Sequence, residues 1–155
     1  MTGGREAAAA AGPVGYALAM ATKAHRVELQ RRMAGLGLYL GQELIIVDVH
    51  RNPGTTQADL ARRIGIEQPT MARALARMER SGFVRREADP ADRRVTRLHL
   101  TGRGAAAVAA VEAAWTETDR RATAGLDPAE ARELVRLLAA VRTAFGSGGP
   151  GGEDG

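Results

Sequence analysis

The chain has 155 residues, of which 45% are hydrophobic and only 3% aromatic, so its core must be built mainly from aliphatic side chains and methionine. It contains no cysteine, which excludes disulfide bonds, thiol catalysis and thiol-based redox sensing and removes the usual ligands of a structural zinc site. The histidines match no metal-binding spacing, and no nucleotide loop or catalytic triad is suggested, so we expect no enzyme and no cofactor. No apolar run approaches the roughly 20 residues of a membrane span and no signal peptide is evident, so we expect a cytoplasmic protein.

The formal net charge of +4 is unevenly distributed along the chain. Residues 51–103 hold 12 arginines and 6 acidic residues, a net of +6, whereas the rest of the chain sums to −2. A focused basic field is typical of a surface that binds a polyanion. A solvated arginine-rich surface gives the same composition, so charge alone leaves both interpretations open.

The first 50 residues predict a tail and then helices. Residues 1–12 are rich in glycine and alanine without a core-forming pattern, and we expect them to be disordered. Residues 14–33 place apolar side chains at helical spacing on one face. Residues 38–50 are apolar nearly all round, which predicts a helix at the centre of the fold, ended by an Asn-Pro-Gly turn. We therefore expect residues 13–50 to supply core and dimer contacts.

The basic middle of the chain predicts two short helices joined by a glycine turn. The first helix has Thr56 as its N-cap with an acid three residues later, and it ends near Gly65, which can adopt the left-handed conformation of a tight turn. The second runs from Gln68 to Arg80, with Gly82 as its C-cap. It has an apolar face, and its other face carries arginines at positions 73, 77 and 80.

This arrangement is a helix-turn-helix pattern, in which the first residues of the second helix reach base edges in the major groove. Glutamine pairs well with adenine and arginine with guanine, each through two hydrogen bonds. Gln68, Thr70 and Arg73 lie in the first turn and a half of the second helix. The alternative is an amphipathic core helix with a solvated arginine face.

A hairpin follows the second helix. Residues 83–87 and 95–100 read as two strands around a polar linker with an Asp-Pro turn signal. A basic hairpin directly after a recognition helix is a wing, and Arg93 or Arg94 at its tip can enter the narrow minor groove. Asp92 is unsuited to a phosphate contact, and we interpret it as a partner that holds one of these arginines.

The C-terminal third predicts two more helices. Residues 103–122 carry apolar side chains and Trp115 on one face, and the last helix begins with a capping box at Asp127. The last helix has an apolar stripe formed by Leu134, Leu138, Val141 and Phe145. Long helices at both ends of a small chain can bury such stripes within the chain or against a second copy, and we expect a homodimer. Residues 102–145 are thus expected to be dimerisation helices, and residues 146–155 a disordered tail.

From Thr56 to Gly104 the chain resembles the MarR family of bacterial transcriptional regulators, on the residues TQADLARRIGIEQPTMARALARMERSGFVRREADPADRRVTRLHLTGRG. The family pattern is a helix-turn-helix, a glycine, an Asp-x-x-Asp-Arg-Arg wing at Asp89–Arg94 and a Leu-to-Thr strand end at Leu98–Thr101. With the flanking helices, the resemblance covers about residues 14–145.

The resemblance implies a mainly α fold with a small β wing, in which residues 51–101 form a winged helix-turn-helix lobe. It also implies a triangular homodimer that binds a pseudo-palindromic operator in double-stranded DNA, as a ligand-responsive repressor. In the major groove it places Gln68, Pro69, Thr70 and Arg73, with Arg77 on a phosphate. The residues expected at the DNA are Thr56, Gln68, Pro69, Thr70, Arg73, Arg77, Asp92, Arg93 and Arg94.

Two features of the sequence distinguish this chain from other members of the family. Glu67 stands where relatives often carry serine, and an acid there suits the helix dipole but repels phosphate. The absence of cysteine argues against the peroxide-sensing branch of the family.

Many members of the family bind small aromatic acids or other anions between the dimer helices and the DNA-binding lobe. The candidate effector residues in this chain are His25, Tyr39, His50, Arg51 and Trp115. Each also has a structural interpretation: His25 as a hydrogen-bonded residue, Tyr39 and Trp115 as core, and the other two as charges that favour a helix dipole.

Two further functions compete with a specific regulator. A sequence-independent architectural DNA-binding protein would share the arginine density, but polar residues at the start of the recognition helix favour base recognition. A winged helix used for protein contacts is the other alternative, and it would lack salt-dependent DNA affinity.

Overall fold

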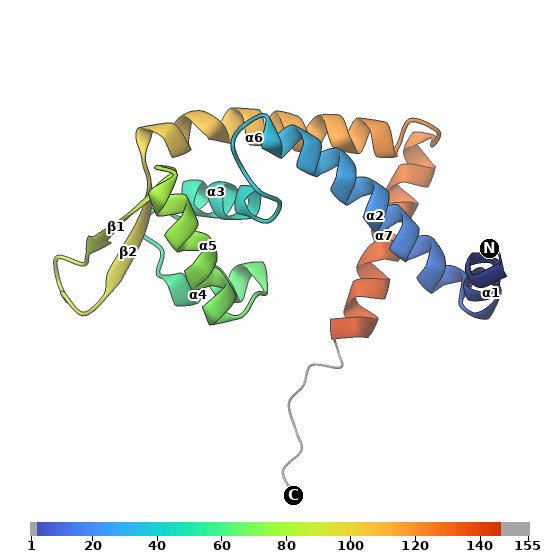
Figure 1. The fold of residues 1–155 in the computed structure, drawn as a ribbon, viewed down its shortest axis with the longest axis horizontal. Helices are drawn as coiled ribbons and strands as arrows, with labels where there is room; N and C mark the ends of the chain where they lie inside the picture. Colours follow the sequence, from blue (N-terminus) through green and yellow to red (C-terminus); the bar gives the residue numbers. More distant parts are fainter. Residues whose placement is uncertain (1–2, 147–155) are drawn as a thin grey trace, which may run out of the picture. The chain divides into compact units, whose positions relative to one another are not determined.

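The computed structural model describes residues 3–146, and residues 1–2 and 147–155 lie outside the described part. The described chain is mainly α-helical with one two-stranded antiparallel sheet, which confirms the predicted fold class. In chain order (Figure 1) the elements are α1 (Gly3–Ala11), α2 (Pro13–Ala34), α3 (Gln42–Arg51), α4 (Gln57–Ile64), α5 (Gln68–Arg80), β1 (Val84–Ala88), β2 (Thr96–Leu100), α6 (Gly102–Ala122) and α7 (Pro128–Gly146). The chain divides into two compact units, Met1–Thr118 and Asp119–Gly155, and all the expected DNA-contacting residues belong to the first.

Both chain ends were expected to be disordered tails, and the N-terminal expectation is wrong for the described residues. Residues 3–11 form α1, because a run of alanines from Ala7 to Ala11 has the highest intrinsic helix propensity. None of the α1 residues is buried, in keeping with the absence of a core-forming pattern. The C-terminal expectation falls, apart from Gly146 at the end of α7, outside the described residues.

The central helix begins later than the apolar pattern predicted. It starts at Gln42 rather than at residue 38, because Gly37 and Gly41 adopt positive φ angles of 74° and 98° that interrupt a helix. Leu38 is nevertheless buried in the loop before α3. Tyr39 was expected in the core, but its side chain is 66% exposed.

The helix-turn-helix forms as predicted, with one correction at its end. Gly65 caps α4 at φ 77°, as expected for the turn. The C-cap of α5 is Ser81, and Gly82 is the following residue, with φ 73°. The Gly82 and Phe83 amides donate to Glu79 and Met78 at 3.0 and 2.9 Å, which is a Schellman motif and sends the chain directly into the hairpin.

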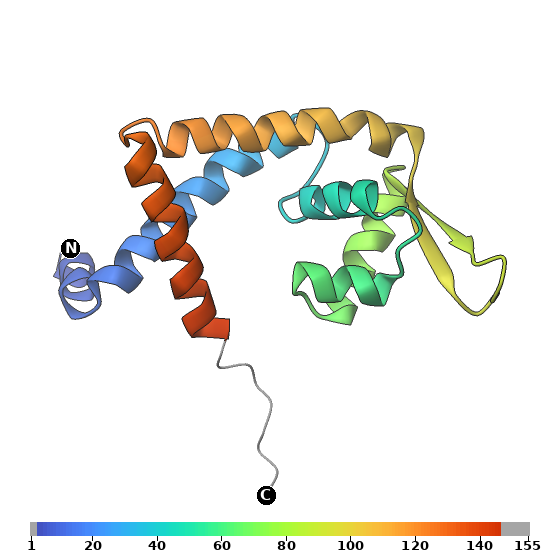
Figure 2. The same ribbon diagram turned by 180° about the vertical axis from the view of Figure 1, so that it is seen from behind.

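The wing is an antiparallel hairpin in which β1 is shifted by one residue from the expected range and β2 begins one residue later than expected. Val84 pairs with Leu100 and Ala88 with Thr96. An isolated bridge between Thr55 and Leu98 adds a third extended segment from the loop before α4. The hairpin extends to one side of α4 and α5 (Figures 1 and 2).

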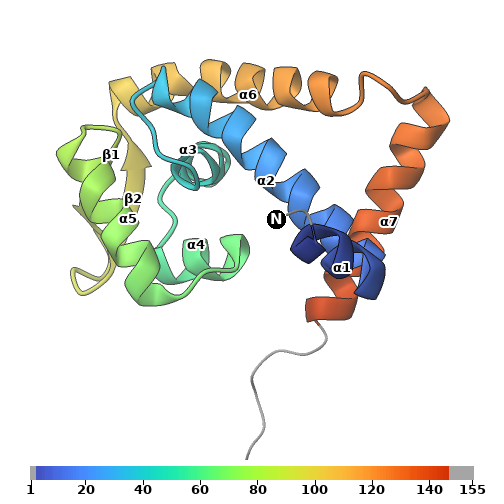
Figure 3. The ribbon, with the colours of Figure 1, turned by 45° about the vertical axis from the view of Figure 1, so that its right-hand side comes forward.

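The helices and the hairpin of the lobe share one hydrophobic core with α2 and α6. It is built from aliphatic and methionine side chains of α2 to α6, with Phe83 as its largest member. Helix α3 lies between the α4–α5 pair and α6 (Figure 3), as expected for the most apolar helix. The fully buried members include Leu29, Met33, Ile45, Ile46, Leu60, Met71, Leu75, Met78, Phe83 and Leu98.

The first turn of α6 is locked to the end of α5. The Thr101 hydroxyl donates to the Gly82 carbonyl at 2.5 Å and accepts from the Gly104 amide at 3.1 Å. The Thr101 amide donates to the Phe83 carbonyl at 3.0 Å. A Cβ on Gly104 would lie 2.1 Å from the Phe83 carbonyl oxygen, so only glycine permits this close approach.

Candidate nucleic-acid interface

The second helix of the motif, α5, has one face in the core and one face in solvent. Met71, Leu75 and Met78 are each 0% exposed and fix the helix rotation. The opposite face carries polar and basic side chains that are all exposed: Gln68, Thr70, Arg73, Arg77 and Arg80. Pro69, at one of the first two helical positions, is also exposed. The α5 face predicted from spacing is therefore available to a partner.

Half of the arginines of the basic middle have an acidic partner, and those on α5 do not. Across residues 51–103, ion pairs hold Arg62, Arg63, Arg85, Arg86, Arg94 and Arg97. Within the described residues, no acidic partner contacts Arg73, Arg77 or Arg80 of α5, nor Arg93 of the wing. Arg51 of α3 and Arg103 of α6 also lack an acidic partner there, and the other unpaired arginines lie on the outer face of α5 and the wing tip. Such a cluster of positive charge is typical of a phosphate-binding surface.

The first helix of the motif is held by its cap. The Thr56 hydroxyl accepts from the Asp59 amide at 3.1 Å and donates to the Asp59 carboxylate at 2.8 Å. The hydrogen bond from the Thr56 hydroxyl holds the pKa of the Asp59 carboxyl below its ordinary value, with Arg62 adding to the effect. Thr56 was expected to contact the DNA, and in this structure its hydroxyl group donates its hydrogen bond to the Asp59 carboxylate.

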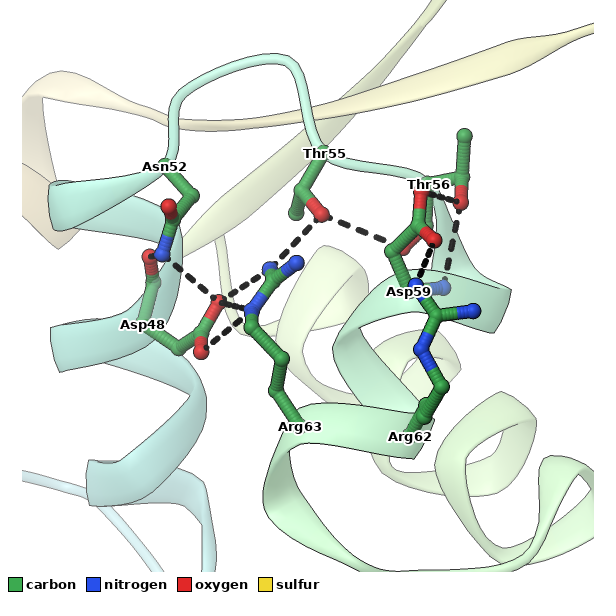
Figure 4. A network of polar contacts seen from close by, with 7 residues as sticks. All are labelled: Asp48, Asn52, Thr55, Thr56, Asp59, Arg62 and Arg63. Carbon is green, nitrogen blue, oxygen red and sulfur yellow. Dashed lines mark hydrogen bonds and ion pairs between the residues drawn. The ribbon is translucent and has the colours of Figure 1, made fainter.

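A polar network joins α4 to α3 behind the exposed face (Figure 4). Arg63 of α4 contacts both carboxylate oxygens of Asp48 of α3, with Nη2 at 2.5 Å from Oδ1 and Nε at 2.9 Å from Oδ2. The same Nη2 donates to the Thr55 hydroxyl at 2.8 Å. The Asp48 hydrogen bond raises the pKa of Arg63. Arg63 therefore links α4 to α3, although its side chain remains 35% exposed.

The wing is organised by one buried carboxylate. Asp89 accepts from the Ala91 and Asp92 amides at 2.7 and 3.1 Å, which closes the turn at the wing tip. Its other oxygen accepts from Arg97 Nε at 2.6 Å, and Arg97 also donates to the Gly54 carbonyl at 3.2 Å. Arg97 is the main cause of the lowered pKa of Asp89. The carboxylate therefore ties the wing tip to its base.

Asp92 holds a wing arginine, as predicted. Its carboxylate accepts from Nε and Nη2 of Arg94 at 3.1 and 3.2 Å, and these contacts lower the pKa of Asp92. The Arg94 side chain is nevertheless 91% exposed, so one guanidinium edge binds Asp92 and the rest faces solvent. Arg93, beside it, is also exposed.

Of the effector candidates, only His25 and Trp115 are in contact with each other. His25 of α2 is half-buried and its ring lies 5.5 Å from the ring of Trp115. Tyr39 lies exposed in the loop before α3, and His50 and Arg51 are exposed at the end of α3. Among the described residues no hydrogen bond, ion pair or ring contact joins His25, Tyr39, His50 and Arg51 to one another, and the effector role of the candidates stays a prediction.

The sequence interpretation missed the residues that position the site. Arg63 with Asp48, Asp89 with Arg97, and Glu79 with Arg86 are contacts between separate elements. Nothing in the local pattern distinguishes these arginines from solvated ones, because their partners lie 15, 8 and 7 residues away.

Neither a metal centre nor a membrane segment was found in the part of the chain that the structure describes. No group of three or more His, Asp or Glu side chains there could hold a metal ion. None of its helices is both long and apolar enough to cross a bilayer.

Comparison with known proteins places the chain in one family. Residues 38–96 match the family model of the MarR family. A crystal structure of MarR is 31% identical, over 86% of this chain and 94% of that one, with a TM-score of 0.70. A probable transcriptional regulator from Pseudomonas aeruginosa is 28% identical, over 83% of this chain and 96% of that one, with a TM-score of 0.76. The transcriptional repressor CouR, bound to a 23-mer DNA duplex, is 26% identical over 92% of this chain and 97% of that one, with a TM-score of 0.78. The chain belongs to the MarR family of transcriptional regulators.

Proposed function

We propose that the protein is a sequence-specific DNA-binding regulator that acts as a homodimeric repressor on a pseudo-palindromic operator. The observation that carries this proposal is the concentration of unpaired arginines on the exposed face of α5, opposite a fully buried apolar face. The described similarity to a repressor bound to duplex DNA supports the same function.

The chemistry of the α5 face divides into base contacts and phosphate contacts. In a helix-turn-helix the N-terminal residues of the second helix meet the base edges. Gln68, Thr70 and Arg73 occupy that part of α5, whereas Arg77 and Arg80 lie further along and suit phosphates. Arg93 and Arg94 at the wing tip suit the minor groove, where narrow A·T-rich segments attract arginine.

The homodimer is supported by apolar surface on α7. Val135 and Phe145 are 69% and 73% exposed, and Leu134, Leu137 and Leu138 are also exposed. Contiguous exposed apolar surface on a helix marks an interaction site. We infer that a second copy of this chain covers this surface. A two-fold dimer would carry two DNA-binding lobes, which would bind half-sites about 10 bp apart.

A random-duplex selection at near-physiological salt tests the proposal. A palindromic consensus is expected. Arg73→Ala should then lose about 1–3 kcal/mol and relax the preference at one position of each half-site. Arg80→Ala is the matched control, because it removes the same charge from the same helix and should weaken binding equally on all sequences. Enrichment of nothing beyond A·T-rich DNA would favour an architectural protein instead.

A further inference from the structure

Four side chains form a continuous polar chain across the lobe. Arg86 Nε of β1 donates to Glu79 Oε2 of α5 at 2.9 Å. Arg86 Nη2 donates to Gln57 Oε1 of α4 at 3.4 Å, and Gln57 Nε2 donates to Gln68 Oε1 at 3.2 Å. This series of hydrogen bonds begins at Glu79 in the C-terminal part of α5, continues through Arg86 of the wing and Gln57 of α4, and ends at Gln68, the first residue of α5.

The Glu79–Arg86 ion pair at one end of this series fixes which group donates and which accepts in every hydrogen bond of the series. An arginine guanidinium has only donors, and an ionised carboxylate has only acceptors. Gln57 must therefore turn its amide oxygen toward Arg86, which leaves its amide nitrogen facing Gln68. Gln68 in turn must present its oxygen to Gln57. The orientation of both amides follows from the Glu79–Arg86 ion pair.

We propose that Gln57 is a positioning residue for base recognition, which orients the Gln68 amide so that its N–H donors face the DNA. The inference rests on the proposed function. Within residues 3–146 the Gln68 amide nitrogen has no acceptor, and the residue is exposed at the start of α5.

An N–H donor in the major groove pairs with guanine O6 or N7, with thymine O4 or with adenine N7, and only adenine among these bases also presents an amine donor there. The bidentate contact of glutamine with adenine needs the amide oxygen and nitrogen side by side against the base. In this structure the oxygen is engaged by Gln57 on the neighbouring helix. The orientation therefore favours a base whose major-groove edge presents acceptors and no amine donor, guanine or thymine, over the adenine suggested by the residue type alone.

The test measures affinities of the full-length protein for the selected duplex and for variants with each base pair at each position of a half-site. Gln68→Ala identifies the position that Gln68 reads. Gln57→Ala should lower discrimination at that same position by roughly two- to tenfold, the range of one neutral hydrogen bond. Thermal unfolding of each variant checks that the lobe is folded.

Gln57→Glu gives the sharper result, because it reverses the direction of the hydrogen bond between residues 57 and 68. A carboxylate at this position accepts from Arg86 with one oxygen and from the Gln68 amide nitrogen with the other, which turns the Gln68 oxygen outward. The preferred base should change from guanine or thymine to adenine or cytosine, whose exocyclic amines are donors. Ala58→Glu is the matched control: it adds the same charge at the next, exposed position of α4 and should weaken all sequences equally.

The possible outcomes separate the two proposals. A changed preference in Gln57→Glu, with an unchanged one in Ala58→Glu, supports the positioning role. If Gln57→Ala and Gln57→Glu both keep the wild-type preference at the Gln68 position, or if Gln68→Ala changes no preference, the positioning role is wrong and the regulator remains. If the wild-type protein itself shows no base preference, the proposed function fails as well.

Discussion

The packing between α6 and the end of α5 predicts an unusual response to a mild substitution, Gly104→Ala. Replacing glycine with alanine inside a helix normally stabilises it by about 0.5–1 kcal/mol. Here the new Cβ would lie 2.1 Å from the Phe83 carbonyl oxygen and 3.2 Å from the Leu100 Cβ. The obstacle is backbone, which cannot rotate away as a flexible side chain can.

The size of the effect follows from what must move. Forcing extra volume into a packed site costs about 1–3 kcal/mol. The Phe83 carbonyl also accepts from the Thr101 amide at 3.0 Å, and weakening that hydrogen bond adds about 1 kcal/mol. The gain in helix propensity offsets up to about 1 kcal/mol of this. We therefore expect Gly104→Ala to destabilise the protein by about 1–3 kcal/mol.

Chemical denaturation followed by far-UV circular dichroism measures this difference, at one fixed protein concentration for all variants. Gly102→Ala is the matched control, because it lies in the same helix and has no atom within 4 Å of its added Cβ. It should be neutral or slightly stabilising. A Gly104→Ala protein as stable as the Gly102→Ala protein would refute the account of the α6 junction.

Three further predictions concern the wing, a buried acid and the dimer. Arg94→Ala should weaken DNA binding without changing the major-groove consensus, as measured by competition binding; unchanged affinity would mean that the wing does not touch DNA. Burial raises the pKa of Glu43 above its ordinary 4.5, so the wild-type protein loses stability as pH rises from there through the raised pKa. The stability of Glu43→Gln relative to wild type should therefore increase with pH in denaturation curves, and a difference independent of pH would contradict the buried-acid assignment. Leu138→Asp should shift the protein toward monomer in sedimentation experiments, whereas Ala140→Asp, on another side of α7, should not; equal effects would remove α7 from the interface.

Helix positions were predictable where the signals are local. The Thr56 cap, the Gly65 turn and the capping box at Asp127 all depend on residues within a few positions, and the structure contains each of them. The start of α3 was not predictable from hydrophobicity, because Leu38 is buried while lying in a loop. Burial and helix formation are separate properties, and here two glycines decide between them.

The candidate site was predictable in its exposed face and not in its support. The spacing of Arg73, Arg77 and Arg80 sets their common face without any tertiary information. Which arginines remain unpaired depends on partners brought together by the fold, such as Asp48 for Arg63. Residues 51–103 contain twelve arginines that are alike in the sequence, and the fold divides them into those paired with an acid and those available to a partner.

The most direct test of the central claim is the ratio of the protein's affinities for its selected duplex and for a scrambled duplex of equal length and composition. The measurement is made at near-physiological salt, because the electrostatic part of DNA affinity falls steeply with salt. A sequence-reading regulator predicts a ratio of about 10³ or more. A ratio near unity would contradict the account and leave the α5 face as a surface that binds DNA without reading it.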